Sequence, residues 1–143
     1  MKKVLFICTG NTCRGPMAEG IFQKMLLDWP EPWAECASVG VSAVKGQKVT
    51  PWAKQVCEKI GVDISGHRAR CLTEDMVKEW DILAVMTADQ KALLLEAGVP
   101  EEKVVLLDIA DPYGGSLNSY RHCRNLIEER IYDRIVVPEG LDK

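Results

Sequence analysis

Residues 4–14 read VLFICTGNTCR, an apolar run followed directly by a polar loop. The run has the length and character of a buried strand, and Cys8 stands at its end. Arg14 closes the loop just before Pro16, a favoured residue at the start of a helix. A loop bent between a strand and a helix offers successive backbone N–H groups to an anion, and the helix N-terminus adds partial positive charge. The stretch therefore predicts a phosphate-binding loop that contains a thiol.

The residue types in this loop suit that chemistry. We expect the field of the loop to lower the pKa of Cys8, so that the reactive thiolate is populated near neutral pH. The planar guanidinium of Arg14 can hold two phosphate oxygens. Gly10 and Asn11 permit the unusual backbone angles of a tight loop. The alternative is that Cys8 is a small apolar residue at the end of a buried strand.

The composition predicts one globular domain. The chain has 143 residues, enough for one domain over residues 1–143 and too few for two. Apolar residues make up 47% and charged residues 27% of the chain, which is usual for a globular protein. The net charge of −3 and the lack of a dense basic run argue against a nucleic-acid partner. The longest apolar runs have strand length, so no membrane association is expected.

The N-terminus and the cysteines predict a reducing, cytoplasmic setting. Met1-Lys2-Lys3 precedes an apolar run as in a signal peptide, but the run stops at Ile7, so export is not expected. The six cysteines are scattered and form no C-x-x-C pair, which argues against zinc and for free thiols. No metal or other cofactor is expected.

Strand-like and helix-like segments alternate along the chain. The expected strands are residues 3–7, 33–39, 82–86 and 104–107. The expected helices are residues 16–28, 51–60, a short helix from 73, 88–97 and 117–136, with a loop over 108–116. Continuous apolar strands separated by helices indicate an α/β fold with a parallel sheet covered on both faces. Because ligands of such sheets bind beyond the carboxyl ends of the strands, Cys8 and the loop at 108–116 should share one edge.

That loop contains a second candidate motif, D-P-Y-G-G-S at residues 111–116. When a thiolate attacks a phosphorylated side chain, the leaving group needs a proton, which a carboxylic acid on a facing loop can donate. Asp111 is the expected acid, and it can then accept a proton from the water that hydrolyses the phosphocysteine. Pro112 stiffens the loop, and Tyr113 offers a flat wall beside the entering side chain. Asp108 is the competing acid, and a plain turn is the structural alternative for the whole motif.

Four segments together match the pattern of one enzyme family. They are C-T-G-N-T-C-R at residues 8–14, S-V-G-V at 38–41, H-R-A-R at 67–70 and D-P-Y-G-G-S at 111–116. With them the chain resembles the low-molecular-weight protein tyrosine phosphatase family over essentially its whole length. The resemblance implies a Rossmann-like, four-stranded parallel sheet with flanking helices. It also implies metal-free hydrolysis through a phosphocysteine.

The resemblance further implies roles for individual residues. Cys8 matches the nucleophile, Arg14 the phosphate clamp and Asp111 the general acid. Asn11 matches the residue that holds the loop by hydrogen bonds, and Cys13 matches a second thiol able to trap an oxidised Cys8 as a reversible disulfide. The residues expected to surround the substrate or its oxyanion are Thr9, Gly10, Asn11, Thr12, Cys13, Gly15 and Tyr113.

Three features bear on the substrate, which should be a phosphorylated protein. Tyrosine-directed family members typically carry isoleucine before the second cysteine, whereas members resembling bacterial protein-arginine phosphatases carry threonine, as here at Thr12. The G-G-S at 114–116 also resembles the arginine group, and residues 41–49, where tyrosine-specific relatives place a second aromatic wall, contain no aromatic residue. A hydroxyl can orient a guanidinium, so phosphoarginine is the favoured substrate. Phosphotyrosine is the alternative, since Thr12 can simply pack and Tyr113 can stack on a phenyl ring.

Gly15 departs from the family, which normally has serine or threonine directly after the arginine. That hydroxyl would stabilise the departing thiolate when the phosphocysteine breaks down. One missing charge-assisted hydrogen bond of about 1.5–3 kcal/mol predicts a roughly ten- to hundredfold slower step.

Other functions stay open at this point. Arsenate reductases of this fold need a relay pair of cysteines after the mid-chain strand, and residues 87–99 contain none. Gly15 leaves room for a weakly active phosphoprotein-binding module. A zinc or redox role lacks partner ligands, and His67 either orders the phosphate loop or has no role. A monomer or weak dimer is expected.

Overall fold

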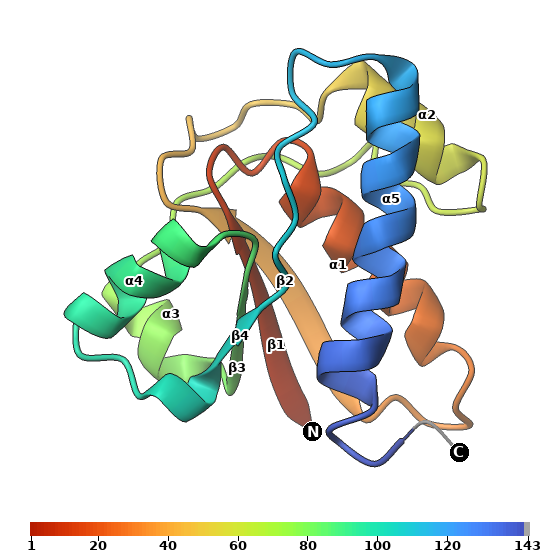
Figure 1. Ribbon diagram of the computed structural model, residues 1–143. Coiled ribbons are helices and arrows are strands. Elements are labelled where there is room, and N and C mark those ends of the chain that lie inside the picture. Colours follow the sequence, from red (N-terminus) through yellow and green to blue (C-terminus); the bar gives the residue numbers. More distant parts are fainter. Residues whose placement is uncertain (142–143) are drawn as a thin grey trace.

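Four parallel strands form the central sheet, in the order β2-β1-β3-β4 (Figure 1). The computed structural model describes residues 1–141. The strands are β1 (Lys2–Cys8), β2 (Ala34–Gly40), β3 (Ile82–Val85) and β4 (Val104–Leu106). The predicted parallel sheet is confirmed, and every strand lies within one residue of its predicted ends.

Helices cover both faces of the sheet, as predicted. One face carries α1 (Arg14–Leu26), α2 (Pro51–Glu58) and α5 (Leu117–Ile131). The other carries α3 (Glu74–Glu79) and α4 (Ala88–Glu96), and the two groups lie on opposite sides of the strands in Figure 1. A short 3-10 turn, Glu101–Lys103, leads into β4. No helix within residues 1–141 combines the length and the apolar character that a bilayer crossing requires.

Alternate side chains of β1 enter two separate cores. Val4 and Phe6 belong to the core under α1 and α5, whereas Leu5 and Ile7 belong to the core under α3 and α4. All four side chains are fully buried. A strand buried on both faces has a continuous apolar sequence, which is why this short run predicts the fold class.

α1 begins earlier than predicted. Its first residue is Arg14 and its N-cap is Cys13, so Pro16 is the third helical residue rather than the first. A proline is accepted there because the N–H groups of the first turn have no partner within the helix. As a result, Arg14 and Gly15 lie in the first helical turn.

The last predicted helix is wrong in its final turn. Residues 117–136 were expected to form one helix, but α5 ends at Ile131 and Tyr132–Val136 form a π-helical turn. Val137 N donates to Tyr132 O at 3.0 Å across this wider turn. Both Ile135 and Val136 are buried at its end.

The chain adds the strands that follow β1 on different sides of it. β2 lies on one side of β1, and β3 lies on the other. Such a switch in direction opens a crevice at the carboxyl ends of the strands, where open α/β sheets bind ligands. Cys8 ends β1 at this edge, and the loop after β4 brings Asp111 to within 3.7 Å of Arg14 there.

Candidate functional site

The turn between β1 and α1 contains one residue in the left-handed backbone region. Asn11 has a φ of 58° and is fully buried. Asparagine is one of the few residues other than glycine that adopts this conformation at modest cost. The sequence predicted unusual angles at Gly10 and Asn11. Asn11 has a positive φ, but Gly10 does not.

Hydrogen bonds hold the Asn11 side chain from behind the loop. Its Nδ2 donates to Ser38 Oγ at 3.1 Å, and its Oδ1 accepts from Arg70 N at 3.0 Å. His67 Nε2 lies 3.0 Å from Asn11 O and 3.2 Å from Asn11 Oδ1. Ser38 in turn donates to Glu19 Oε1 at 2.8 Å. The structure thus places His67, whose part was open from the sequence, directly against the loop, and it adds Ser38 as a supporting residue.

The loop also packs tightly against the end of β2. A Cβ atom at Gly40 would lie 2.4 Å from the carbonyl oxygen of Thr9, so only glycine fits without displacing the loop. Immediately beyond, Val41 N donates to Cys8 O at 2.9 Å. The backbone of the loop is therefore held by β2 as well as by Asn11.

Cys8 lies deep in the loop, with 2% of its surface exposed. Burial raises the pKa of this thiol, while the backbone N–H groups of Asn11 and Gly15 and the charge of Arg14 lower it. The charge of Asp111 raises it further. The net direction is upward, so the expected lowering of the Cys8 pKa is wrong. Removal of the sulfur from water outweighs the donors around it.

Arg14 is a buried cation with a defined orientation. Its Nη1 donates to Ile109 O at 2.9 Å and its Nη2 to Thr9 Oγ1 at 3.4 Å. The same Nη2 lies 3.7 Å from Asp111 Oδ2. Its Nε is buried and has no hydrogen-bond partner within residues 1–141. A guanidinium fixed at both ends with one free N–H is suited to receive an oxyanion.

Asp111, in the loop after β4, contacts the phosphate loop. Its Oδ1 accepts from Cys13 Sγ at 3.5 Å and from Tyr113 N at 3.0 Å, and nearly half of its side chain is exposed. The carboxylate is thus positioned by two donors and by Arg14, yet it is open to solvent.

Asp108, the competing acid, is placed differently. It is exposed, has a φ of 57°, and its carbonyl accepts from Arg130 Nη1 at 3.1 Å. Its carboxylate makes no hydrogen bond or ion pair with any residue of 1–141. Of the two predicted acids, the structure brings Asp111 to the loop.

The thiols are free at all six cysteines. Burial, followed by the charge of Asp111, raises the pKa of Cys13 to about 12, so Cys13 is a hydrogen-bond donor at neutral pH. Burial likewise raises the pKa to about 12 in each of the packed cysteines, Cys36, Cys57 and Cys123. The reversible disulfide between Cys8 and Cys13 stays a prediction.

The remaining predicted residues belong to the phosphate loop, the first turn of α1 and the loop at 108–116. Thr12 is partly buried, and its carbonyl accepts from Thr50 N at 2.9 Å. Tyr113 is 73% exposed, and its part as a wall stays a prediction. A Cβ atom at Gly15 would lie 2.8 Å from Cys8 Sγ and 2.9 Å from Asn11 Nδ2. A side chain at position 15 would therefore require the side chains of Cys8 and Asn11 to shift.

Gln90 is a supporting residue that the sequence analysis missed. Its Oε1 accepts from Met86 N at 2.8 Å and Thr87 N at 3.1 Å, and its Nε2 donates to Thr9 Oγ1 at 3.2 Å. Gln90 is buried at the start of α4, where Thr87 is the N-cap. The capping pattern could have predicted its backbone contacts, but not its link to Thr9.

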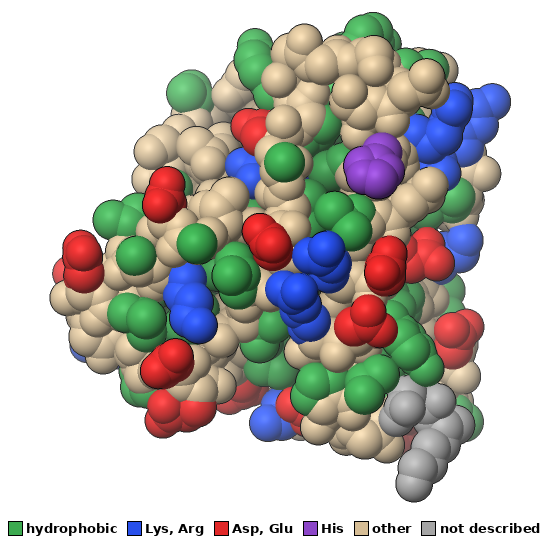
Figure 2. Space-filling view, in the orientation of Figure 1, with side chains coloured by type: hydrophobic (Ala, Val, Ile, Leu, Met, Phe, Trp, Pro, Cys, Tyr) green, Lys and Arg blue, Asp and Glu red, His purple; other side chains and the backbone are tan. Residues whose placement is uncertain are grey.

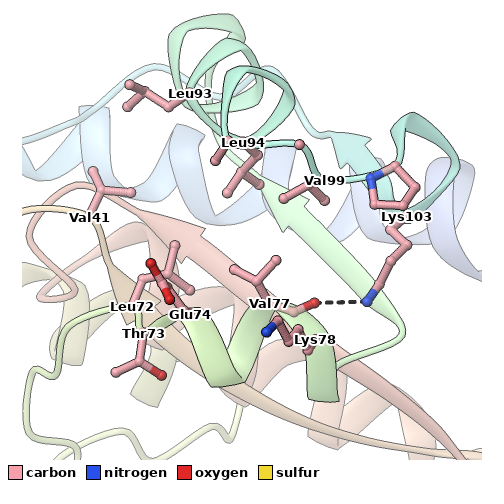
Figure 3. Close-up of a pocket in the computed structure, with 13 residues that line it drawn as sticks. Val41, Leu72, Thr73, Glu74, Val77, Lys78, Leu93, Leu94, Val99 and Lys103 are labelled. Atoms are coloured by element: carbon pink, nitrogen blue, oxygen red, sulfur yellow. Dashed lines mark hydrogen bonds between the residues drawn. The ribbon is translucent and has the colours of Figure 1, made fainter.

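A cavity of about 610 Å³ between α3 and α4 is separate from these residues (Figure 3). Figure 3 shows Leu94 and Val99 facing Leu72 and Val77 across it. It is lined by no residue of the phosphate loop or the loop at 108–116, and by no cysteine or histidine. The reactive groups lie at the edge of the sheet instead.

Comparison with known proteins agrees with this fold. Residues 3–135 match the family described as low molecular weight phosphotyrosine protein phosphatase. The chain is 34% identical to a protein-arginine-phosphatase of Geobacillus stearothermophilus, with 93% of each chain covered. It is 31% identical to the probable low molecular weight protein-tyrosine-phosphatase EpsP of Ralstonia nicotianae, with 92% of each covered. The solved structure of the YwlE arginine phosphatase from Geobacillus stearothermophilus is similar, with a TM-score of 0.86 at 31% identity, covering 98% of this chain and 94% of the other.

A parallel α/β sheet with a cysteine–arginine loop at its edge is the architecture of a cysteine-dependent phosphatase. The chain belongs to the low-molecular-weight protein tyrosine phosphatase family. It is accordingly a protein phosphatase, and relatives named for arginine and for tyrosine substrates are similar to it to nearly the same degree.

Proposed function

We propose that this phosphatase hydrolyses phosphoarginine in proteins through a phosphocysteine on Cys8. In the first step, the proton of the Cys8 thiol passes to a phosphoryl oxygen of the bound substrate, and the sulfur attacks phosphorus to form an S–P bond. The P–N bond to the arginine side chain breaks, and Asp111, protonated at this stage, gives its proton to the leaving nitrogen. The free Nε of Arg14 and the N–H groups of the loop bind the phosphoryl oxygens.

In the second step, water attacks phosphorus. The Asp111 carboxylate takes the proton of that water, the S–P bond breaks, and inorganic phosphate and the Cys8 thiolate are released. The position of Asp111 supports both parts of its role, because it is close to Arg14 and also reaches solvent. Cys13 of the phosphate loop and the backbone N–H of Tyr113 donate to this carboxylate and hold it in place.

The choice of phosphoarginine over phosphotyrosine rests on the presence of a threonine at position 12. Thr12 is partly buried in the phosphate loop, and its hydroxyl can hydrogen-bond a guanidinium or a water that solvates one. The neighbouring segment 41–49 contributes no aromatic ring that would clasp a phenyl group. The identity of 34% to a protein named as a protein-arginine-phosphatase supports the same choice.

Phosphotyrosine is the second candidate, and Tyr113 favours it. This ring is exposed beside Asp111 and can stack on an aromatic substrate. Relatives named as tyrosine phosphatases, among them EpsP at 31% identity, are compatible with that function.

The test is the ratio of kcat/KM for two peptides of identical flanking sequence, one with phosphoarginine and one with phosphotyrosine. We expect the wild type to favour phosphoarginine and Thr12→Ile to lower the ratio about tenfold or more, since a lost polar contact is replaced by an apolar floor. Thr12→Ser, which keeps the hydroxyl, is the matched control and should preserve the preference. A wild-type preference for phosphotyrosine, or a ratio that Thr12→Ile leaves unmoved, would contradict the proposal.

A further inference from the structure

Two segments outside the phosphate loop hold its backbone by hydrogen bonds. Both ends of segment 41–50 are tied to the loop, since Ser42 N donates to Thr9 O at 3.0 Å and Thr50 N to Thr12 O at 2.9 Å. Segment 67–70 contacts the loop through His67 and Arg70, as described above. We refer to residues 41–50 and 67–70 together as the rim.

The two segments of the rim are also joined to each other. Gly46 N donates to Ala69 O at 2.8 Å, and Ala69 N donates to Gln47 O at 2.9 Å. Lys48 and Arg68 are partners in an isolated antiparallel bridge. These bonds fix the backbone of the rim, so the Cα atoms that carry its exposed side chains are held in place next to the phosphate loop.

The rim is cationic, although the whole chain is acidic. It carries Lys45, Lys48, Arg68 and Arg70, all of them exposed, and no aspartate or glutamate. Within residues 1–141, none of these four forms an ion pair. One donor of Arg70 is already used, because its Nε donates to Ser38 O at 3.3 Å. The ammonium groups of Lys45 and Lys48 have no hydrogen-bond partner in the described chain. By contrast, Figure 2 shows acidic and basic side chains interspersed over the face that bears α5.

We propose that the rim binds carboxylate side chains that flank the phosphorylated residue of the protein substrate. This rests on the proposed phosphatase function and adds the class of substrate sequence that the site selects. Lys45 and Lys48 form no ion pair within residues 1–141, so an incoming aspartate or glutamate gains attraction without displacing an existing one. Four cations are too few for nucleic acid, which binds through many phosphate contacts.

The experiment compares an acidic peptide with a neutral one. Both carry the same phosphorylated residue, and aspartates in the first are asparagines in the second. The readouts are kcat/KM and the Kd of fluorescent peptides for Cys8→Ser protein, in which binding is measured without turnover. We expect the acidic peptide to be favoured about three- to tenfold at low salt, with the preference shrinking as salt screens exposed charges.

Lys45→Gln/Lys48→Gln should remove most of this preference, and Lys45→Arg/Lys48→Arg should keep it. Lys2→Gln is the matched control, because Lys2 is an exposed lysine at the opposite end of β1, and the preference should survive it. Equal values of kcat/KM and Kd for the two peptides in the wild type would overturn the proposal. So would a preference that the Gln/Gln variant retains. If no peptide is hydrolysed, the proposed function is wrong. The comparison of Kd values for the acidic and the neutral peptide still shows whether the rim binds carboxylates.

Discussion

The carboxylate of Asp111 lies 3.7 Å from the guanidinium of Arg14, although the two residues are far apart in the sequence. The sheet explains the meeting, because β1 and β4 run parallel and their carboxyl ends share an edge. Asp111 is therefore close enough to affect the charge of the buried site as well as to move protons there.

The first prediction concerns the ionisation of Cys8. The negative charge of Asp111 raises the Cys8 pKa, so Asp111→Asn should lower it. The thiolate then forms at lower pH, and the pH profile for alkylation of Cys8 by iodoacetamide should move to lower pH. Asp108→Asn is the control and should leave the profile in place, since Asp108 has no part in the shift. A profile that moves upward in Asp111→Asn would contradict the placement of this charge.

The second prediction concerns proton donation. Without an acid at position 111, the leaving group departs unprotonated, and kcat for a phosphopeptide should fall by about 10²-fold or more. The loss should be smaller for p-nitrophenyl phosphate, whose leaving group is already stable as an anion. Equal losses for both substrates would mean that Asp111 acts through structure or charge instead. Asp108→Asn should leave both rates near those of the wild type.

The third prediction tests the space around Gly15. A Cβ atom there would lie 2.8 Å from Cys8 Sγ, so Gly15→Ala should destabilise the protein by about 1–3 kcal/mol and reduce turnover. Gly66→Ala is a matched control, because a Cβ atom at Gly66 meets no other group within 4 Å. Chemical denaturation measures both. If Gly15→Ala proves as stable and as active as Gly66→Ala, the helix backbone does not approach the sulfur as described.

The fourth prediction separates the two properties of Asn11. Asn11→Ala loses the contacts to Ser38, His67 and Arg70 and places an alanine at a φ of 58°, so it should cost about 2–4 kcal/mol in the free energy of unfolding. Asn11→Gly loses the same contacts but accepts the backbone angle, and it should therefore be the more stable of the two variants. Denaturant unfolding decides the order, and the reverse order would contradict a left-handed Asn11.

Much of the fold could be predicted from local patterns. The run Val4–Ile7 is buried on both faces, and a strand of that kind occurs almost only in parallel sheets under helices. The first residue of α1 was harder to predict, because a proline is accepted at more than one position of a first helical turn. The π-helical turn after Ile131 was not predictable from apolar spacing, since it depends on how Ile135 and Val136 fit the finished core.

Site residues divide in the same way. Cys8, Arg14 and Asp111 stand in motifs with unusual composition, so they could be selected before their positions were known. Gln90 and Ser38 act through contacts with residues far away in the sequence, and nothing beside them indicates those partners. The direction of the Cys8 pKa shift depends on burial of the thiol, which exists only in the folded chain.

The most direct test of the central claim is to trap the covalent intermediate. Wild-type protein is mixed with p-nitrophenyl phosphate, quenched in acid during turnover and analysed by peptide mass spectrometry. We expect the mass of one phosphoryl group on the peptide that contains Cys8, with a burst of nitrophenol because Gly15 offers no hydroxyl to speed breakdown, and no turnover in Cys8→Ala. Steady turnover with Cys8 unmodified in every quenched sample, and activity retained in Cys8→Ala, would contradict the account.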